Sequence, residues 1–168
     1  METRTTWYVI YTRSRQEKVV AERLSTAGYE VYLPLIKVIS QWSDRKKLVE
    51  KPLFNSYVFI REVKETDRIK GFTGVVGFLK YDNKPARVQQ REIETLKSII
   101  RHGYDVSELG DPSLLVKGSK VMVMGGPLKG NVGELYENSE SEWFIIHFEN
   151  IGNSIKVKIP GKLLKKLE

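Results

Sequence analysis

At 168 residues, the chain is long enough for one domain of ordinary size, or for one domain of about 100 residues plus a smaller one. Hydrophobic residues make up 40% of the sequence and charged residues 29%, a composition that indicates a globular protein and excludes intrinsic disorder. The formal charge of +7 favours contact with a polyanion, and the absence of cysteine excludes disulfide scaffolds and thiolate chemistry.

The beginning of the chain predicts a strand followed by a helix. Residues 7–12 are aromatic or β-branched, as in a strand that is buried on both faces. Ser14 precedes Glu17 by three residues, the spacing of a capping box, which predicts the start of a helix over 15–27. Gly28 suits the end of that helix. Its apolar face carries Val20, Leu24 and Ala27.

The next stretch predicts two strands separated by a polar arm. Residues 29–39 have a strand pattern, in which Pro34 indicates an edge or a bulge. A polar loop or hairpin arm follows, with three adjacent cations near its expected turn: Arg45, Lys46 and Lys47. Residues 53–60 then resume the strand pattern.

Two more helices and a strand complete the expected first domain. A short helix is predicted over 66–70, a strand over 75–81, and a long amphipathic helix over 89–102 that ends at Gly103. Long helices packed on one mostly antiparallel sheet make an α+β domain, which we expect over residues 1–102.

The remaining sequence predicts a linker and a small β domain. Residues 103–112 are acidic and rich in glycine and have no usable periodicity, so we expect a linker there. Four short strand-like segments follow within 113–168 and predict a small all-β barrel: 120–124, 132–136, 143–148 and 155–159. A terminal helical turn or a frayed tail is expected after Pro160.

No motif in the sequence indicates an enzyme. Gly125 and Gly130 have the spacing of a phosphate-binding loop, but Asn131 and Val132 stand where that loop needs Lys and Ser or Thr, so a tight turn is favoured. The two histidines are far apart in sequence. We therefore expect no catalytic residue, no metal and no cofactor.

Two groups of side chains are candidates for binding. The first is aromatic and is either a docking patch for a protein or part of the core: Tyr11, Phe54, Tyr57 and Phe59. The second marks the start and polar side of the first helix and is either a nucleic-acid contact or a solvated helical face: Arg13, Arg15, Lys18 and Arg23.

Several segments resemble the NusG family of transcription elongation factors. In the first domain they are residues 7–11, the block Pro-Leu-Phe-Asn-Ser-Tyr-Val-Phe at 52–59, and residues 74–78. In the second, residues 118–123 and 126–133 resemble a KOW motif, with its loop at Gly126, Pro127, Lys129, Gly130 and Gly133. The amino-acid sequences of the 52–59 block and of the basic turn are more similar to those of RfaH-like, operon-specific antiterminators than to those of the general factor.

The resemblance implies the fold, an NGN-like α+β domain with a KOW barrel of the SH3 type, and a function. The first domain would bind the clamp helices of the largest RNA polymerase subunit and suppress pausing or termination. Tyr11, Phe54, Tyr57 and Phe59 would form or support that surface. The non-template DNA strand would contact the basic turn and helix at Arg13, Ser14, Arg15 and Arg23.

For the second domain, the family suggests a ribosomal small-subunit protein or the termination factor Rho as partner. Its many β-branched residues favour a stable barrel over the helical hairpin that RfaH-like proteins also adopt. An alternative function is a KOW module that binds the ribosome or structured RNA. Since no apolar run reaches about 18 residues and no signal peptide is evident, we expect a cytoplasmic protein without a membrane partner. We also expect a monomer.

Overall fold

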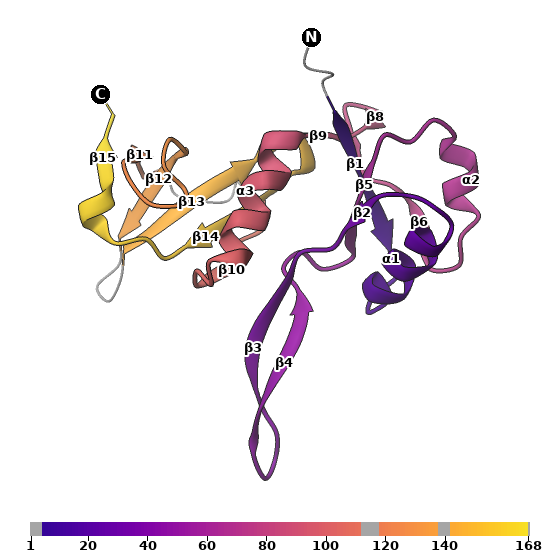
Figure 1. The fold of residues 1–168 in the computed structure, drawn as a ribbon, viewed down its shortest axis with the longest axis horizontal. Coiled ribbons are helices and arrows are strands. Elements are labelled where there is room, and N and C mark those ends of the chain that lie inside the picture. Colours follow the sequence, from indigo (N-terminus) through magenta and orange to yellow (C-terminus); the bar gives the residue numbers. More distant parts are fainter. Residues whose placement is uncertain (1–4, 112–117, 138–141, 168) are drawn as a thin grey trace. The chain divides into compact units, whose positions relative to one another are not determined.

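The computed structural model describes residues 5–111, 118–137 and 142–167 and divides into two compact units (Figure 1). The boundary lies between Ile93 and Glu94, inside the long helix α3 (Gln90–Arg101). It therefore falls earlier than the expected domain end at residue 102. The second half of α3 belongs to the second unit, where Thr95 Oγ1 donates to Asn131 Oδ1 at 3.3 Å.

The first unit is built on an antiparallel sheet. Its strands lie in the order β2 (Val31–Tyr32), β5 (Tyr57–Arg61), β1 (Thr6–Thr12) and β6 (Val75–Phe78). A short strand, β9 (Arg87–Gln89), also pairs with β1. A tight hairpin joins β7 (Lys80–Tyr81) to β8 (Lys84–Pro85). The predicted α+β class of this domain is confirmed.

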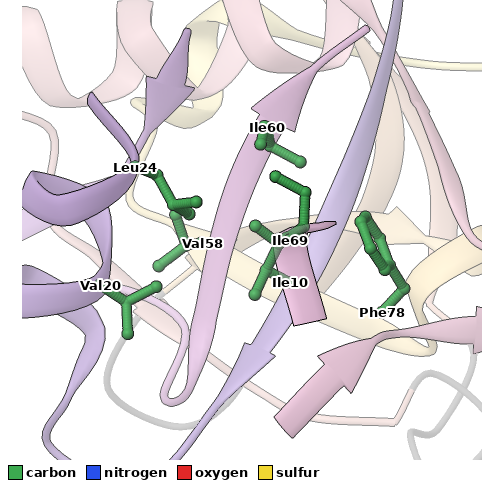
Figure 2. Packing of buried hydrophobic residues seen from close by; sticks show 7 residues of the cluster. All are labelled: Ile10, Val20, Leu24, Val58, Ile60, Ile69 and Phe78. Carbon is green, nitrogen blue, oxygen red and sulfur yellow. The ribbon is translucent and has the colours of Figure 1, made fainter. Parts of the chain in front are cut away.

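Helices α1 (Glu17–Thr26) and α2 (Thr66–Lys70) pack on this sheet (Figure 2). They bury their side chains against β1, β5 and β6 in one cluster: Ile10, Val20, Leu24, Val58, Ile60, Ile69 and Phe78. Helix α1 ends as its sequence predicts, in a Schellman motif. The Gly28 N–H donates to the Ser25 carbonyl and the Tyr29 N–H to the Leu24 carbonyl, at 3.0 and 3.1 Å.

An isolated hairpin, the β3–β4 arm, extends away from the sheet of the first unit (Figure 1). It consists of β3 (Leu35–Gln41) and β4 (Lys46–Pro52), which form a two-stranded sheet and pair with no other strand of the described residues. The strand expected over 29–39 is thus broken into β2 and β3, because Pro34 stands between them and lacks an N–H for a ladder. Its carbonyl accepts the Leu53 N–H at 2.8 Å and fixes the base of the arm.

The second unit is a six-stranded antiparallel sheet. Its strands lie in the order β10 (Val106–Glu108), β14 (Asn153–Val157), β13 (Glu142–Phe148), β12 (Val132–Glu137), β11 (Ser119–Val123) and β15 (Leu164–Lys166). All four predicted strands are present. The segment 103–112, expected as a linker, instead supplies β10, because buried Val106 joins the ladder of β14.

Among its described residues, the second unit also contains the 3₁₀ turns η2 (Glu149–Ile151) and η3 (Gly161–Leu163). The second turn is the helical turn expected after Pro160, and β15 then pairs with β11. The β-rich expectation for this domain is therefore confirmed, and its described residues hold strands rather than a helical hairpin.

Candidate functional site

Tyr11 and Tyr57 form an aromatic pair at the surface of the first unit. They are partners in the register of β1 and β5, and their ring centroids lie 6.3 Å apart. Tyr11 is 43% exposed and Tyr57 is half-buried. Each ring offers an apolar body and a polar tip, a combination that suits contact with a protein.

The other two aromatic candidates lie in the interior. Phe54 and Phe59 are fully buried, with centroids 6.0 Å apart, and Phe54 also stacks on Tyr57 at 6.0 Å. Of the two alternatives open from the sequence, core holds for these phenylalanines and surface for Tyr11. Phe54 therefore packs directly against the surface residue Tyr57, and Phe59 packs on Phe54 in the core.

Hydrogen bonds tie the end of β1 to the start of α1 and to the loop before β5. The Thr12 N–H donates to the Ser56 carbonyl at 2.8 Å, and the Ser56 N–H donates to Glu17 Oε1 at 2.9 Å. The Arg13 N–H donates to the Gly74 carbonyl at 2.9 Å. Glu17 is only 6% exposed, so its bond to the half-buried Ser56 is partly removed from water. We call this assembly the β1–α1 corner: residues 11–17, 54–57 and 73–74.

The predicted capping box is wrong. Helix α1 begins at Glu17 with Gln16 at its N-cap, and no side chain caps it. Ser14 and Arg15 lie in the turn before the helix, where Arg15 has a φ of 61°. The Glu17 carboxylate bonds Ser56 instead of reaching back to Ser14, because a distant backbone N–H competes successfully for it.

Three exposed arginines lie in or beside the β1–α1 corner. Arg13, Ser14 and Arg15 are exposed on one turn. Arg23, also exposed, sends its guanidinium to the Thr73 carbonyl at 2.9 Å. The carbonyls of segment 73–74 thus accept hydrogen bonds from both the Arg13 backbone and the Arg23 side chain. This segment therefore links the first and last residues of the set predicted to bind DNA.

A depression of about 730 Å³ adjoins this segment, and its lining includes Arg23, Phe72 and Thr73. It also includes Arg68 of α2, a cation that sequence reasoning missed. Arg68 is exposed and lies in a helix of only five residues. Its position beside Arg23 depends on how α2 packs, so no local motif signals it.

The predicted KOW loop joins β11 to β12. The Gly130 N–H donates to the Val123 carbonyl at 2.8 Å, and the Lys129 N–H donates to that of Gly126 at 3.1 Å. Leu128 is buried and anchors the loop, while Pro127 and Lys129 are exposed. The tight turn favoured over a phosphate-binding loop is what the structure contains.

Gly133 is required for close packing within the second unit. A Cβ at this position would meet the Ile145 carbonyl and the ring of Phe144 on β13. The glycine therefore lets β12 approach its neighbour closely.

Among the described residues, no cluster of three or more His, Asp or Glu side chains is arranged to hold a metal ion. Within the same residues, no helix has the length and apolarity needed to cross a membrane.

A family model described as "Transcription termination factor nusG" matches residues 5–97, more than half of the chain. The chain belongs to the NusG family. A NusG-family relative, "Transcription termination/antitermination protein NusG" of Neisseria meningitidis serogroup B (strain ATCC BAA-335 / MC58), is 23% identical over 181 residues. That alignment covers 96% of this chain and 97% of the relative.

The NusG likeness extends to the three-dimensional structure. A solved structure described as "Domain interaction in Thermotoga maritima NusG" superposes with a TM-score of 0.60 at 19% identity and covers 98% of both chains. At this identity the likeness shows the fold. The recognition of the family from its sequence segments is confirmed, and the chain is related to transcription termination and antitermination factors.

Proposed function

We propose that this chain is a transcription elongation and antitermination factor that binds the clamp helices of the largest RNA polymerase subunit. The observation that carries the proposal is the β1–α1 corner, which presents the tyrosines and the cations on one hydrogen-bonded scaffold. Tyr11 and Tyr57 supply the protein contact, and buried Phe54 holds Tyr57 in place.

The turn beside the tyrosines is suited to a nucleic acid. Arg13 and Arg15 are exposed, and Ser14 between them offers a hydroxyl. Guanidinium groups bind phosphates with two hydrogen bonds and stack on unpaired bases. We assign Arg13, Ser14, Arg15 and Arg23 to the non-template DNA strand, which is single-stranded where the polymerase has opened the duplex.

This activity needs no bond chemistry and operates through conformational equilibrium. A factor that binds the closed clamp tenfold more tightly than the open clamp shifts that equilibrium by about 1.4 kcal/mol. The expected outcome is less pausing and less termination. The sequence of residues 52–59 resembles that of RfaH-like proteins, and on this basis we propose that the factor is operon-specific, as they are. The KOW domain then recruits a ribosomal small-subunit protein or Rho.

Recovery of RNA polymerase on the immobilised full-length chain tests the protein contact. The double variant Tyr11→Ala/Tyr57→Ala is expected to lose the polymerase while its thermal unfolding stays cooperative. Tyr81→Ala is the matched control, because Tyr81 is 55% exposed on β7, away from the corner. Undiminished recovery of the polymerase by the double variant would refute the assignment of the contact to Tyr11 and Tyr57. Recovery of ribosomal RNA alone by the parent chain would refute polymerase binding and favour the RNA-binding alternative.

Transcription in vitro on a template with a defined pause tests the activity. The parent chain is expected to shorten the pause, and Tyr11→Ala/Tyr57→Ala is expected to abolish the effect. Arg13→Gln/Arg15→Gln is expected to reduce crosslinking to the non-template strand while polymerase recovery persists. Crosslinking that is unchanged in this variant would remove the DNA assignment and leave the polymerase assignment intact.

A further inference from the structure

The β3–β4 arm carries more positive charge than its own structure uses. Residues 35–52 contain five cations and two anions. At the tip, Arg45, Lys46 and Lys47 are consecutive and exposed, and no described carboxylate forms an ion pair with them. Like charges at this density repel one another, so a bound polyanion would lower the electrostatic free energy of the arm by neutralising them.

An exposed indole lies at the same tip. Gln41 pairs with Lys46, which leaves a four-residue loop from Trp42 to Arg45, closed by the Trp42 N–H donating to the Arg45 carbonyl at 2.8 Å. The Trp42 side chain is 54% exposed although it is among the most apolar of side chains. Lys47 Nζ lies 5.9 Å from the centroid of its ring, so ring and cations form one surface.

We propose that the tip of the β3–β4 arm binds a single strand of nucleic acid, with one base stacked on Trp42 and phosphates contacted by Arg45, Lys46 and Lys47. A flat indole beside exposed cations is the combination that single-strand sites use, because every base has a face to stack and every nucleotide carries a phosphate. A duplex keeps its bases stacked inside and leaves Trp42 without a partner.

This site is separate from the DNA contact proposed for the β1–α1 corner. It uses other residues on another part of the first unit, on a hairpin that makes no ladder with the sheet. The two sites can therefore be lost independently.

Fluorescence of the full-length chain tests the proposal directly, with the oligonucleotides dT12 and rU12 as probes. Of the three tryptophans, Trp7 is buried and Trp143 lies on β13 of the second unit, so Trp42 is the reporter at the tip. Either probe is expected to quench the emission, and comparison of the two tells whether DNA or RNA is preferred. Trp42→Phe is expected to keep the affinity within about threefold while losing most of the quenching, whereas Trp42→Ala weakens binding by about fivefold or more.

The cations are tested by the salt dependence of binding, measured by anisotropy of a labelled oligonucleotide. Lys46→Gln/Lys47→Gln is expected to lower the slope of log affinity against log salt by about 1.4, since each phosphate contact on a single strand contributes about 0.7. The control Lys80→Gln/Lys84→Gln removes two exposed cations from the β7–β8 hairpin and is expected to leave the slope unchanged.

Three results would overturn the proposal: quenching that persists in Trp42→Phe, an equal loss of slope in both lysine pairs, or equal binding of a twelve-base-pair duplex. Arg13→Gln/Arg15→Gln is expected to retain the quenching of Trp42. Failure at the arm is thereby distinguished from failure at the β1–α1 corner.

Discussion

Replacement of Glu17 by alanine is expected to destabilise the first unit by about 2–4 kcal/mol. The Ser56 N–H loses the carboxylate that accepts it at 2.9 Å, and a hydrogen bond to a charged group contributes about 1.5–3 kcal/mol. Removal of an acidic residue from the first turn of α1 costs a further ~0.3–1 kcal/mol. Glu17→Gln keeps an acceptor but loses the charge, so it is expected to cost roughly half as much.

Urea unfolding followed by the emission of Trp7 measures this loss. In a Trp42→Phe/Trp143→Phe background, Trp7 is the sole tryptophan, and it is buried on β1. Glu22→Gln is the matched control because Glu22 is exposed on the same helix, and its change is expected to stay within about 0.5 kcal/mol. If Glu17→Ala also stays within that range, the carboxylate does not hold the β1–α1 corner together.

Three further predictions concern stability, each measured by urea unfolding. Phe54→Ala is expected to cost about 3–5 kcal/mol because the ring is fully buried, and a near-neutral effect would place the ring at the surface. Gly133→Ala is expected to cost about 1–3 kcal/mol because its Cβ would meet the Ile145 carbonyl; an unchanged midpoint would mean that β12 has room to spare. Leu128→Ala is expected to cost about 2–5 kcal/mol. Lys129→Ala, its exposed neighbour, is expected to cost less than about 0.5 kcal/mol, and equal losses would contradict the anchoring role of Leu128.

Local patterns in the sequence predicted the elements well and their partners poorly. Val20 and Leu24 lie on the buried face of α1, because four-residue spacing places side chains on one face wherever the helix packs. The capping box failed because the partner of Glu17 is Ser56, 39 residues away, and local spacing carries no information about such a bond.

The same distinction explains the aromatic residues. Strand alternation placed Tyr57 and Phe59 on one face, but β5 lies between β1 and β2, and three consecutive residues of it are buried. The exposure of a side chain on β5 depends on which elements cover each face of the sheet, and the alternation of residues along a strand carries no information about that. In residues 103–112, acidic composition indicated a linker, whereas Val106 finds its partner in Val157, about fifty positions later.

Because the β3–β4 arm is structurally separate from the central sheet, its length can change as related sequences diverge. Since neither strand of the arm pairs with the central sheet, residues gained or lost near its tip leave the core untouched. Changes of two residues per strand preserve which side chains share a face, so the reach of the arm can change without altering its chemistry. Related proteins with arms of different lengths can thus contact targets at different distances from the sheet while the rest of the first unit stays the same.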